Sequence, residues 1–376
     1  MLYASQSLME HRHSMLRKGM KEAGYKALLI VGNSEPNQRG YVRYVSDWRL
    51  FGGTAYVIFP LEDQPILIMG LGAQAEWARE LSAIPDTRPV LNKNEALLAA
   101  LKERGLEKAR LGAVGWKRII PAGDAAEIAT GLPGMRLEDA TGLMESVMMT
   151  LSAEELAQVE ETHGFVVKVL ERIAKALQPG RTERDVLAEG IHEAALHGCL
   201  DGMAHIGTGQ ASRTMPGSDR RIGEGDIIKL FLEFAGPSGF LVELGAVLSF
   251  TQPPEIQQRK FDTYVRAMER AAEMMRPGNK VSDLCLRIKE TFEEDGLKIT
   301  GRRLWDFHGQ GLHSILPPLG MPDSDETLNE NSMINIHPGI LTEDGIGVSA
   351  THNYIVTSEG GRALGAFKPR WLVLNP

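Results

Sequence analysis

The chain has 376 residues, of which 43% are hydrophobic and 24% charged, and its formal net charge is −8 at pH 7. This balance is that of a soluble globular protein of about two domains, and it lacks the clustered basic excess needed to bind nucleic acid or an anionic membrane surface. The two cysteines, Cys199 and Cys285, lie far apart in the sequence, which excludes a disulfide framework and a zinc ribbon.

The N-terminal segment carries charges every few residues and has no apolar core of the kind found in signal peptides. No apolar run in the sequence is long enough to span a bilayer. We therefore expect a cytoplasmic protein without a membrane partner.

Residues 1–150 alternate between helical and extended patterns. An amphipathic stretch that stops at Gly24 predicts a helix, and short apolar runs at 27–31, 54–59 and 65–70 predict buried strands because turn-forming residues bound them. Further strand and helix patterns follow in the same region. The sequence thus predicts an N-terminal α/β domain of ordinary size.

A second domain is expected over residues 151–376. Ser152 stands three residues before Glu155, which is the pattern of a capping box. The long helix that it opens should stop at the Pro-Gly pair 179–180.

The second domain contains an internal repeat. The sequence ERIAKALQPG at 171–180 recurs as ERAAEMMRPG at 269–278, and each copy leads into a second helix whose cap is expected near Thr182 or Ser282. Extended, glycine-rich sequence follows each helix pair. Two amphipathic helix pairs need a common apolar surface, which a curved antiparallel sheet supplies. The fold class expected for the whole chain is therefore α+β.

Two carboxylates stand out in a strongly apolar part of this domain. Residues 225–250 read as two strands joined by a tight GPSG turn, and they carry Glu233 and Glu243. A buried carboxylate is costly unless it is paired, hydrogen-bonded or bound to a metal. A solvent-facing position on the strand remains the alternative for Glu243.

Four of the ten histidines fall between positions 308 and 352. They are His308, His313, His337 and His352, and several of them stand at expected strand or loop ends. A lone histidine is usually a packed core residue, but this grouping favours a metal site or an acid–base site. The sequence alone leaves all three interpretations open.

On these residues the chain resembles the creatinase, aminopeptidase P and prolidase family, which has the "pita-bread" fold. The matching motifs are SDRRIGEGDII (218–228), FHGQGLHSILPP (307–318), INIHPGI (334–340) and GVSATHNYIVTSEG (347–360). The resemblance implies a creatinase-like α/β domain over 1–150. It also implies a pita-bread domain with two pseudo-symmetric helix pairs over 151–376, and a homodimer.

The resemblance also implies a rewritten metal site. Dinuclear members of the family bind two metals through Asp, Asp, His, Glu and Glu, and these positions fall here on Leu232, Glu243, His308, His337 and Thr351. Leu232 and Thr351 cannot supply the bridging carboxylates that two cations need. Glu243, His308 and His337 suit a single Zn, Fe or Mn ion. A metal-free site, as in creatinase, fits the sequence equally well.

In the metal-free alternative a histidine has to act as the base, and His308, His337 and His352 are the candidates. His313 and Glu233 are further candidates for catalytic residues. The substrate-side histidine of the family falls near Thr214 here.

The family also places substrate contacts in the stretch 40–53. The candidates there are Arg43, Trp48, Arg49 and Phe51. A strand and turn that merely pack the domain are the alternative for this stretch.

The activity expected from the resemblance is hydrolysis of a C–N bond in a small polar metabolite. Two alternatives remain open: a lyase acting on a small zwitterionic substrate, and a non-catalytic binding homologue.

Overall fold

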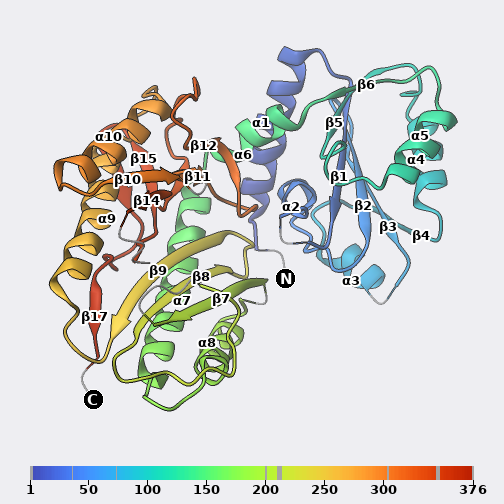
Figure 1. The fold of residues 1–376 in the computed structure, drawn as a ribbon. Coiled ribbons are helices and arrows are strands. Elements are labelled where there is room, and N and C mark those ends of the chain that lie inside the picture. Colours follow the sequence, from blue (N-terminus) through green and yellow to red (C-terminus); the bar gives the residue numbers. More distant parts are fainter. Residues whose placement is uncertain are drawn as a thin grey trace. The chain divides into compact units, whose positions relative to one another are not determined.

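The computed structural model describes residues 3–35, 37–72, 74–199, 201–209, 214–302, 305–343 and 348–374. The chain divides into two compact units, Met1–Met148 and Met149–Pro376, which we call unit 1 and unit 2 and describe separately (Figure 1). The mixed α and β architecture confirms the expected fold class.

Unit 1 is a mixed sheet with helices packed on it. Its helices are α1 (Gln6–Ala23), α2 (Gly40–Ser46), α3 (Gln74–Leu81), α4 (Lys93–Glu103), α5 (Ala122–Gly131) and α6 (Thr141–Met149). Its strands are β1 (Ala27–Asn33), β2 (Thr54–Pro60), β3 (Ile66–Gly70), β4 (Asp86–Val90), β5 (Arg110–Val114) and β6 (Arg136–Asp139). The strand order is β4-β3-β2-β1-β5-β6, so the buried strand β1 lies inside the sheet.

Helix α2 corrects one alternative from the sequence, because residues 40–46 form a helix and not a strand. The β-branched Val42 and Val45 favour a strand only weakly, and packing of the helix against β1 decides the outcome. Val42 lies so close to Gly32 that a Cβ atom on that glycine would stand 2.7 Å from Val42 Cγ2. Asp47, with a left-handed φ of 53°, ends the helix.

The described residues of unit 2 form two helix pairs and three sheets, the smallest of which pairs only β10 with β14. Its helices are α7 (Ala153–Ala176), α8 (Glu183–Leu196), α9 (Glu255–Glu273) and α10 (Val281–Glu294). The strands of its first half are β7 (Asp201–Thr208), β8 (Ile227–Ala235) and β9 (Leu241–Ser249). Those of its second half are β10 (Ile299–Arg302), β11 (Phe307–Gly309), β12 (Leu316–Leu319), β13 (Met333–Ile336), β14 (Ile340–Thr342), β15 (His352–Thr357) and β16 (Gly360–Ala363), and β17 (Trp371–Val373) follows.

The internal repeat of the sequence is present in the backbone of unit 2. After each Pro-Gly break, the glycine amide donates to a later strand-like segment: Gly180 to Ile222 at 2.8 Å and Gly278 to Leu328 at 2.9 Å. Both glycines have left-handed φ values, which helps to explain why glycine stands at both positions. The first half of unit 2 thus comprises α7, α8 and β7–β9, and the second half comprises α9, α10 and β10–β16.

The helix caps of the two halves differ. Ser152 forms the capping box that the sequence predicts, and the cap expected near Thr182 is also a capping box. The cap expected near Ser282 is wrong, because the second helix of the second half begins at Val281 and Ser282 lies inside it. The preceding residue, Lys280, makes no side-chain cap. The backbone bond from Val281 to Glu326 supplies a partner for the helix start.

The two larger sheets of unit 2 have the orders β17-β9-β8-β7 and β12-β11-β13-β15-β16, and they meet where β9 approaches β15. An isolated bridge joins Gly245 to Thr351 at this seam. In Figure 1, α7 and α8 lie beside β7–β9, and α9 and α10 lie beside the strands of the second half. Apolar residues from α9, α10 and these strands form one buried core.

Candidate functional site

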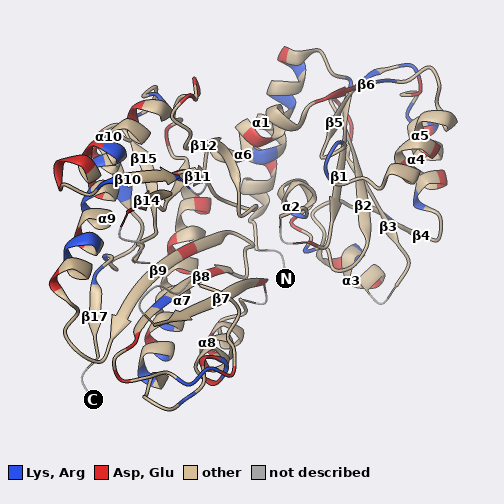
Figure 2. Cartoon of the chain, viewed as in Figure 1, with Lys and Arg blue, Asp and Glu red and all other residues tan. Residues whose placement is uncertain are grey.

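The two carboxylates predicted from the apolar hairpin are buried and face each other across it. Strands β8 and β9 pair antiparallel with Glu233 directly opposite Glu243, and both residues are buried. Figure 2 shows acidic bands on these otherwise largely uncharged strands. The solvent-facing alternative for Glu243 is therefore wrong.

Strands of the second half bring two histidines to Glu243. His308 lies on β11, and His337 directly follows β13, which pairs with β11. Ligand atoms of Glu243, His308 and His337 all lie within 4.8 Å of one another, and we call these three residues the carboxylate–histidine cluster.

The buried Asp306 fixes the position of His337. Its backbone oxygen accepts a hydrogen bond from the His337 amide at 3.0 Å, and its carboxylate accepts one from the Gly339 amide at 3.0 Å. Arg302 forms an ion pair with the same carboxylate, which compensates its burial.

The hydrogen bonds of His308 define which ring nitrogen faces the cluster. Its Nδ1 lies 2.9 Å from the carbonyl oxygen of Gly309. Because a carbonyl can only accept, Nδ1 carries the hydrogen, and in the neutral ring Nε2 keeps its lone pair. This lone pair faces Glu243 Oε2 at 3.7 Å, so a proton or a cation is needed to make the contact attractive.

The arrangement fits one divalent cation. Zinc bonds to nitrogen and oxygen are about 2.0–2.2 Å, so two ligands of one tetrahedral ion stand about 3.4 Å apart. The 3.7 Å separation of His308 Nε2 and Glu243 Oε2 is close to that value. The set of two imidazoles and one carboxylate suits Zn or Fe(II).

The residues do not fit a second ion of the dinuclear type. Leu232 is fully buried and pairs with Leu244, so it offers no ligand. The Thr351 hydroxyl lies 3.0 Å from Glu243 Oε1 and 2.8 Å from Asn335 Oδ1. A neutral hydroxyl and amide thus occupy the position where the family pattern has a carboxylate.

The two carboxylates have different proton affinities. Burial and the neighbouring Glu243 charge raise the pKa of Glu233 to about 7. Burial also acts to raise the pKa of Glu243, but His308, His337 and Thr351 together hold it below its usual value. Burial alone would lower the pKa of His308, but Glu243 raises it above the ordinary value. Glu243 is therefore suited to bind a cation, and Glu233 to exchange a proton near neutrality.

Sequence reasoning missed the amides around this cluster. Asn353 Oδ1 accepts a hydrogen bond from the Glu243 backbone N–H at 2.9 Å, and Asn353 Nδ2 donates to Gln310 Oε1 at 2.6 Å. Gln310 Nε2 in turn donates to Glu233 Oε1 at 2.9 Å. The Ser314 hydroxyl also hydrogen-bonds to Glu233. Asparagine and glutamine are common at many positions, so only the strand pairing reveals their role.

The structure places His352 away from the carboxylate–histidine cluster. Side chains alternate along β15, so Thr351 and Asn353 face Glu243 and His352 faces the opposite side. There its ring packs against His163 of α7, with ring centroids 5.3 Å apart. Burial lowers the pKa of His352 to about 3 and that of His163 to about 4.

The remaining predicted residues of unit 2 lie near the strands. His313 is buried in the turn between β11 and β12, where its backbone oxygen accepts from Gly311. Thr214 precedes Met215, whose backbone pairs with Ile206 on β7. Catalytic or substrate contacts of His313, His352 and Thr214 stay predictions.

The substrate-contact candidates of unit 1 differ in exposure. Arg43 and Trp48 are buried, and burial lowers the pKa of Arg43 to about 10. Phe51 is 41% exposed, with its ring edge-on to Trp48 and the Arg49 guanidinium 5.3 Å from its centroid. Their role in substrate binding stays a prediction.

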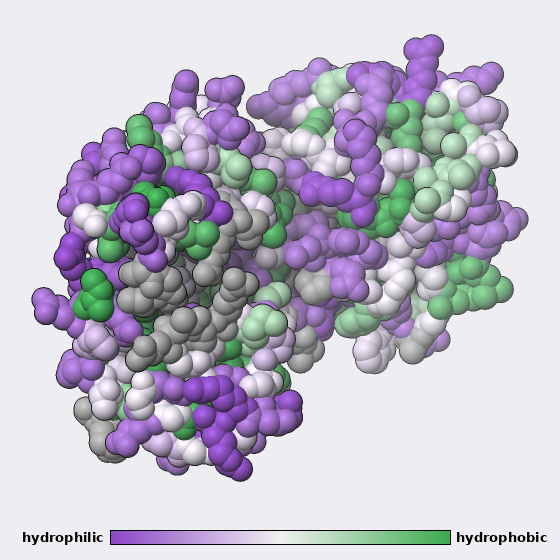
Figure 3. Space-filling model, viewed as in Figure 1, coloured by the Kyte–Doolittle hydropathy of each residue, from purple (hydrophilic) through white to green (hydrophobic). Residues whose placement is uncertain are grey.

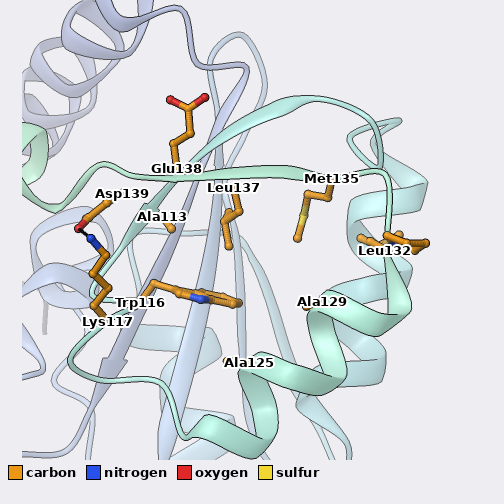
Figure 4. Close-up of a pocket in the computed structure, with 11 residues that line it drawn as sticks. Ala113, Trp116, Lys117, Ala125, Ala129, Leu132, Met135, Leu137, Glu138 and Asp139 are labelled. Atoms are coloured by element: carbon orange, nitrogen blue, oxygen red, sulfur yellow. Dashed lines mark ion pairs between the residues drawn. The ribbon is translucent and has the colours of Figure 1, made fainter.

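Unit 1 also holds a pocket of about 400 Å³ beside α5 and β6 (Figure 4). The Trp116 ring lies along it, opposite small residues such as Ala125 and Ala129, and Lys117 pairs with Asp139 at 3.0 Å at one edge.

Hydrophilic residues cover much of the surface visible in Figure 3.

Comparison with known proteins identifies the family. The sequence pattern of "Metallopeptidase family M24" matches residues 157–358, which is more than half of the chain. The chain belongs to this family. The M24 match covers both halves of unit 2 and includes Glu243, His308 and His337. It confirms the resemblance found in the sequence motifs.

Known M24 relatives and similar structures are hydrolases and peptidases. The chain is 23% identical to an uncharacterized hydrolase/peptidase (y4tM) of Sinorhizobium fredii, with 97% of each covered. It is 24% identical to the ectoine hydrolase of Halomonas elongata, covering 65% of this chain and 64% of that protein. The crystal structure of the X-Pro aminopeptidase from Thermotoga maritima has a TM-score of 0.84 at 17% identity, over 96% of this chain and 99% of that one. The dipeptidase PepE from Mycobacterium ulcerans has a TM-score of 0.82 at 19% identity, over 99% and 100%.

These relatives confirm the expected hydrolase class and pita-bread fold. None of the described helices has both the length and the hydrophobicity to span a bilayer.

Proposed function

We propose that this protein hydrolyses a C–N bond in a small polar metabolite, with one divalent metal ion bound by Glu243, His308 and His337. The observation that carries the proposal is the convergence of three ligand atoms within 4.8 Å in a buried site. Membership of a metallopeptidase family supports a metal at this position. The similarity to ectoine hydrolase supports a small substrate.

A metal bound here would act as a Lewis acid or lower the pKa of a water molecule. In the proposed reaction, Glu233 transfers the proton. Hydrolysis places the oxygen of water on carbon and a proton of water on the leaving nitrogen. With a pKa of about 7, Glu233 can accept that proton and deliver it within one cycle.

Metal analysis tests the centre. Protein purified without chelator, and protein stripped and then offered Zn, Fe or Mn, should bind one ion per chain. His308→Ala and His337→Ala should lose it, whereas His192→Ala, at an exposed helix position, should retain it. A wild-type protein that binds none of the three metals would overturn the one-metal centre in favour of the metal-free alternative.

Turnover of a panel of small amides, N-acyl amino acids, ureido compounds and proline dipeptides tests the reaction. A hydrolase incorporates ¹⁸O from labelled water into the carbonyl product. Cleavage without ¹⁸O indicates a lyase, and binding without cleavage indicates a non-catalytic homologue. Either result contradicts the proposed hydrolysis.

A further inference from the structure

A directional chain of hydrogen bonds runs from the backbone of Glu243 to the carboxylate of Glu233. It starts at the backbone N–H of Glu243, which bonds to Asn353, continues to Gln310, and ends at Glu233 Oε1. We call the two middle residues, Asn353 and Gln310, the amide relay. Both side chains are buried, at 0% and 1% exposure, so bulk water does not compete for these bonds.

The direction of the relay follows from its first member. A backbone N–H can only donate, so the Asn353 atom that meets it is the oxygen, and the Asn353 NH₂ group points to Gln310. The atom of Gln310 that meets this NH₂ is then its oxygen, which leaves the Gln310 NH₂ group facing Glu233. Neither side-chain amide can flip without placing two donors or two acceptors against each other.

We infer that Asn353 and Gln310 are positioning residues, which fix the orientation of the Glu233 carboxylate toward the reacting atoms through the amide donor on Oε1. The inference rests on the proposed function for the role of Glu233. In hydrolysis, the Glu233 carboxylate then takes the proton from water and passes it to the leaving nitrogen. The carboxyl reaches the reaction already oriented, which lowers the entropic cost of proton transfer.

The relay also joins the two larger sheets of unit 2, in the region where the Gly245–Thr351 bridge joins their backbones. Asn353 lies on β15, and the strand pairing sets it opposite Asn335 of β13. A purely structural role for Asn353 would be to tie β15 to β9 through the Glu243 amide. The two roles are separable, because an aspartate side chain keeps the oxygen that accepts from Glu243 and loses the NH₂ that donates to Gln310.

The test compares Asn353→Asp with Gln310→Met in the full-length protein. With a substrate from the panel, each variant should lower kcat by about ten-fold or more and change KM little. Gln310→Met loses the hydrogen bond to the Glu233 carboxylate, and Asn353→Asp loses the donor that orients Gln310. In a Glu233→Gln background the same changes should have no further effect. Asn94→Asp, a buried asparagine of unit 1, is the control and should retain activity.

An infrared measurement tests the relay without any substrate. The carboxyl band assigned to Glu233 by its loss in Glu233→Gln should shift in Asn353→Asp, although Asn353 does not touch Glu233. An unchanged band, or kinetic effects that simply add to those of Glu233→Gln, would overturn the relay. Should Asn353→Asp fail to fold, Gln310→Met decides by the same band. If wild-type protein cleaves no compound, the proposed hydrolysis fails while the infrared result still judges the relay.

Discussion

The two halves of unit 2 carry their ionisable groups in different places. The first half holds Glu233 and Glu243 inside β8 and β9, which have nine residues each. The second half holds His308 and His337 on or next to β11 and β13, which have three and four. Long strands keep two carboxylates in fixed register, whereas short strands let loops bring histidines from two segments to one point. The duplicated backbone therefore positions the strands, and the residues that differ between the two halves form the candidate site.

Removing one carboxylate from the first half gives the largest expected effect. Glu243→Gln should weaken metal binding at least about 100-fold, because a ligand is lost and two neutral histidines remain. Glu233→Gln should retain the metal and lose turnover. Calorimetric titration with Zn and activity assays on both variants check this contrast. Equal metal affinity in the two variants would contradict the division of roles between the paired carboxylates.

The seam between the two sheets gives the next largest effect. A Cβ atom at Gly245 would stand 2.5 Å from Thr351 Cγ2. Gly245→Ala should therefore lower the free energy of unfolding by about 1–3 kcal/mol, as measured by urea denaturation. Adding Thr351→Ser removes the clashing methyl group and should restore part of the loss. Gly225→Ala, whose added methyl group meets open space, is the matched control. A similar small change in the free energy of unfolding of Gly245→Ala and Gly225→Ala would contradict the predicted clash at Gly245.

The contact of β15 with α7 predicts sensitivity to acid. His163 and His352 are neutral when folded, with pKa values of about 4 and 3, and each returns to about 6.5 on unfolding. The unfolded state therefore binds more protons below pH 6.5, so stability falls as pH decreases toward 4. Each histidine with such a lowered pKa should reduce the free energy of unfolding by on the order of 2 kcal/mol between about pH 7 and pH 5.

Urea denaturation at the two pH values checks this effect in His163→Gln. The variant should lose less stability on acidification than the wild type, and the exposed-position control His192→Gln should behave like the wild type. An acid response that is the same in all three proteins would contradict the neutral histidine pair.

The helix caps give the smallest effect and separate the two halves directly. Thr182→Ala removes a capping box and should lower the free energy of unfolding by about 1 kcal/mol. Ser282→Ala should leave it nearly unchanged, because the equivalent helix of the second half has no side-chain cap. Chemical denaturation of both variants measures the difference. Equal losses would show that Ser282 caps its helix in solution.

Local signals in the sequence were sufficient for much of this molecule. The helix stop at Gly24, the capping boxes and the apolar hairpin depend on neighbouring residues, and the structure confirms them. The amide relay depends on contacts between residues 43 to 110 positions apart, and strand register decides which of them meet. His352 illustrates the same limit, since its neighbour Thr351 reaches Glu243 while alternation turns the histidine to the other face.

The close approach at Gly245 and Thr351 also constrains how this site can change over time. Any side chain at position 245 would meet Thr351, so position 245 can change only if position 351 changes with it. A lineage that kept glycine there would remain free to exchange threonine for a larger ligand-bearing residue. A lineage with alanine at position 245 would lose that possibility. The absence of a single methyl group thus leaves room at position 351 for a side chain that could bind a cation.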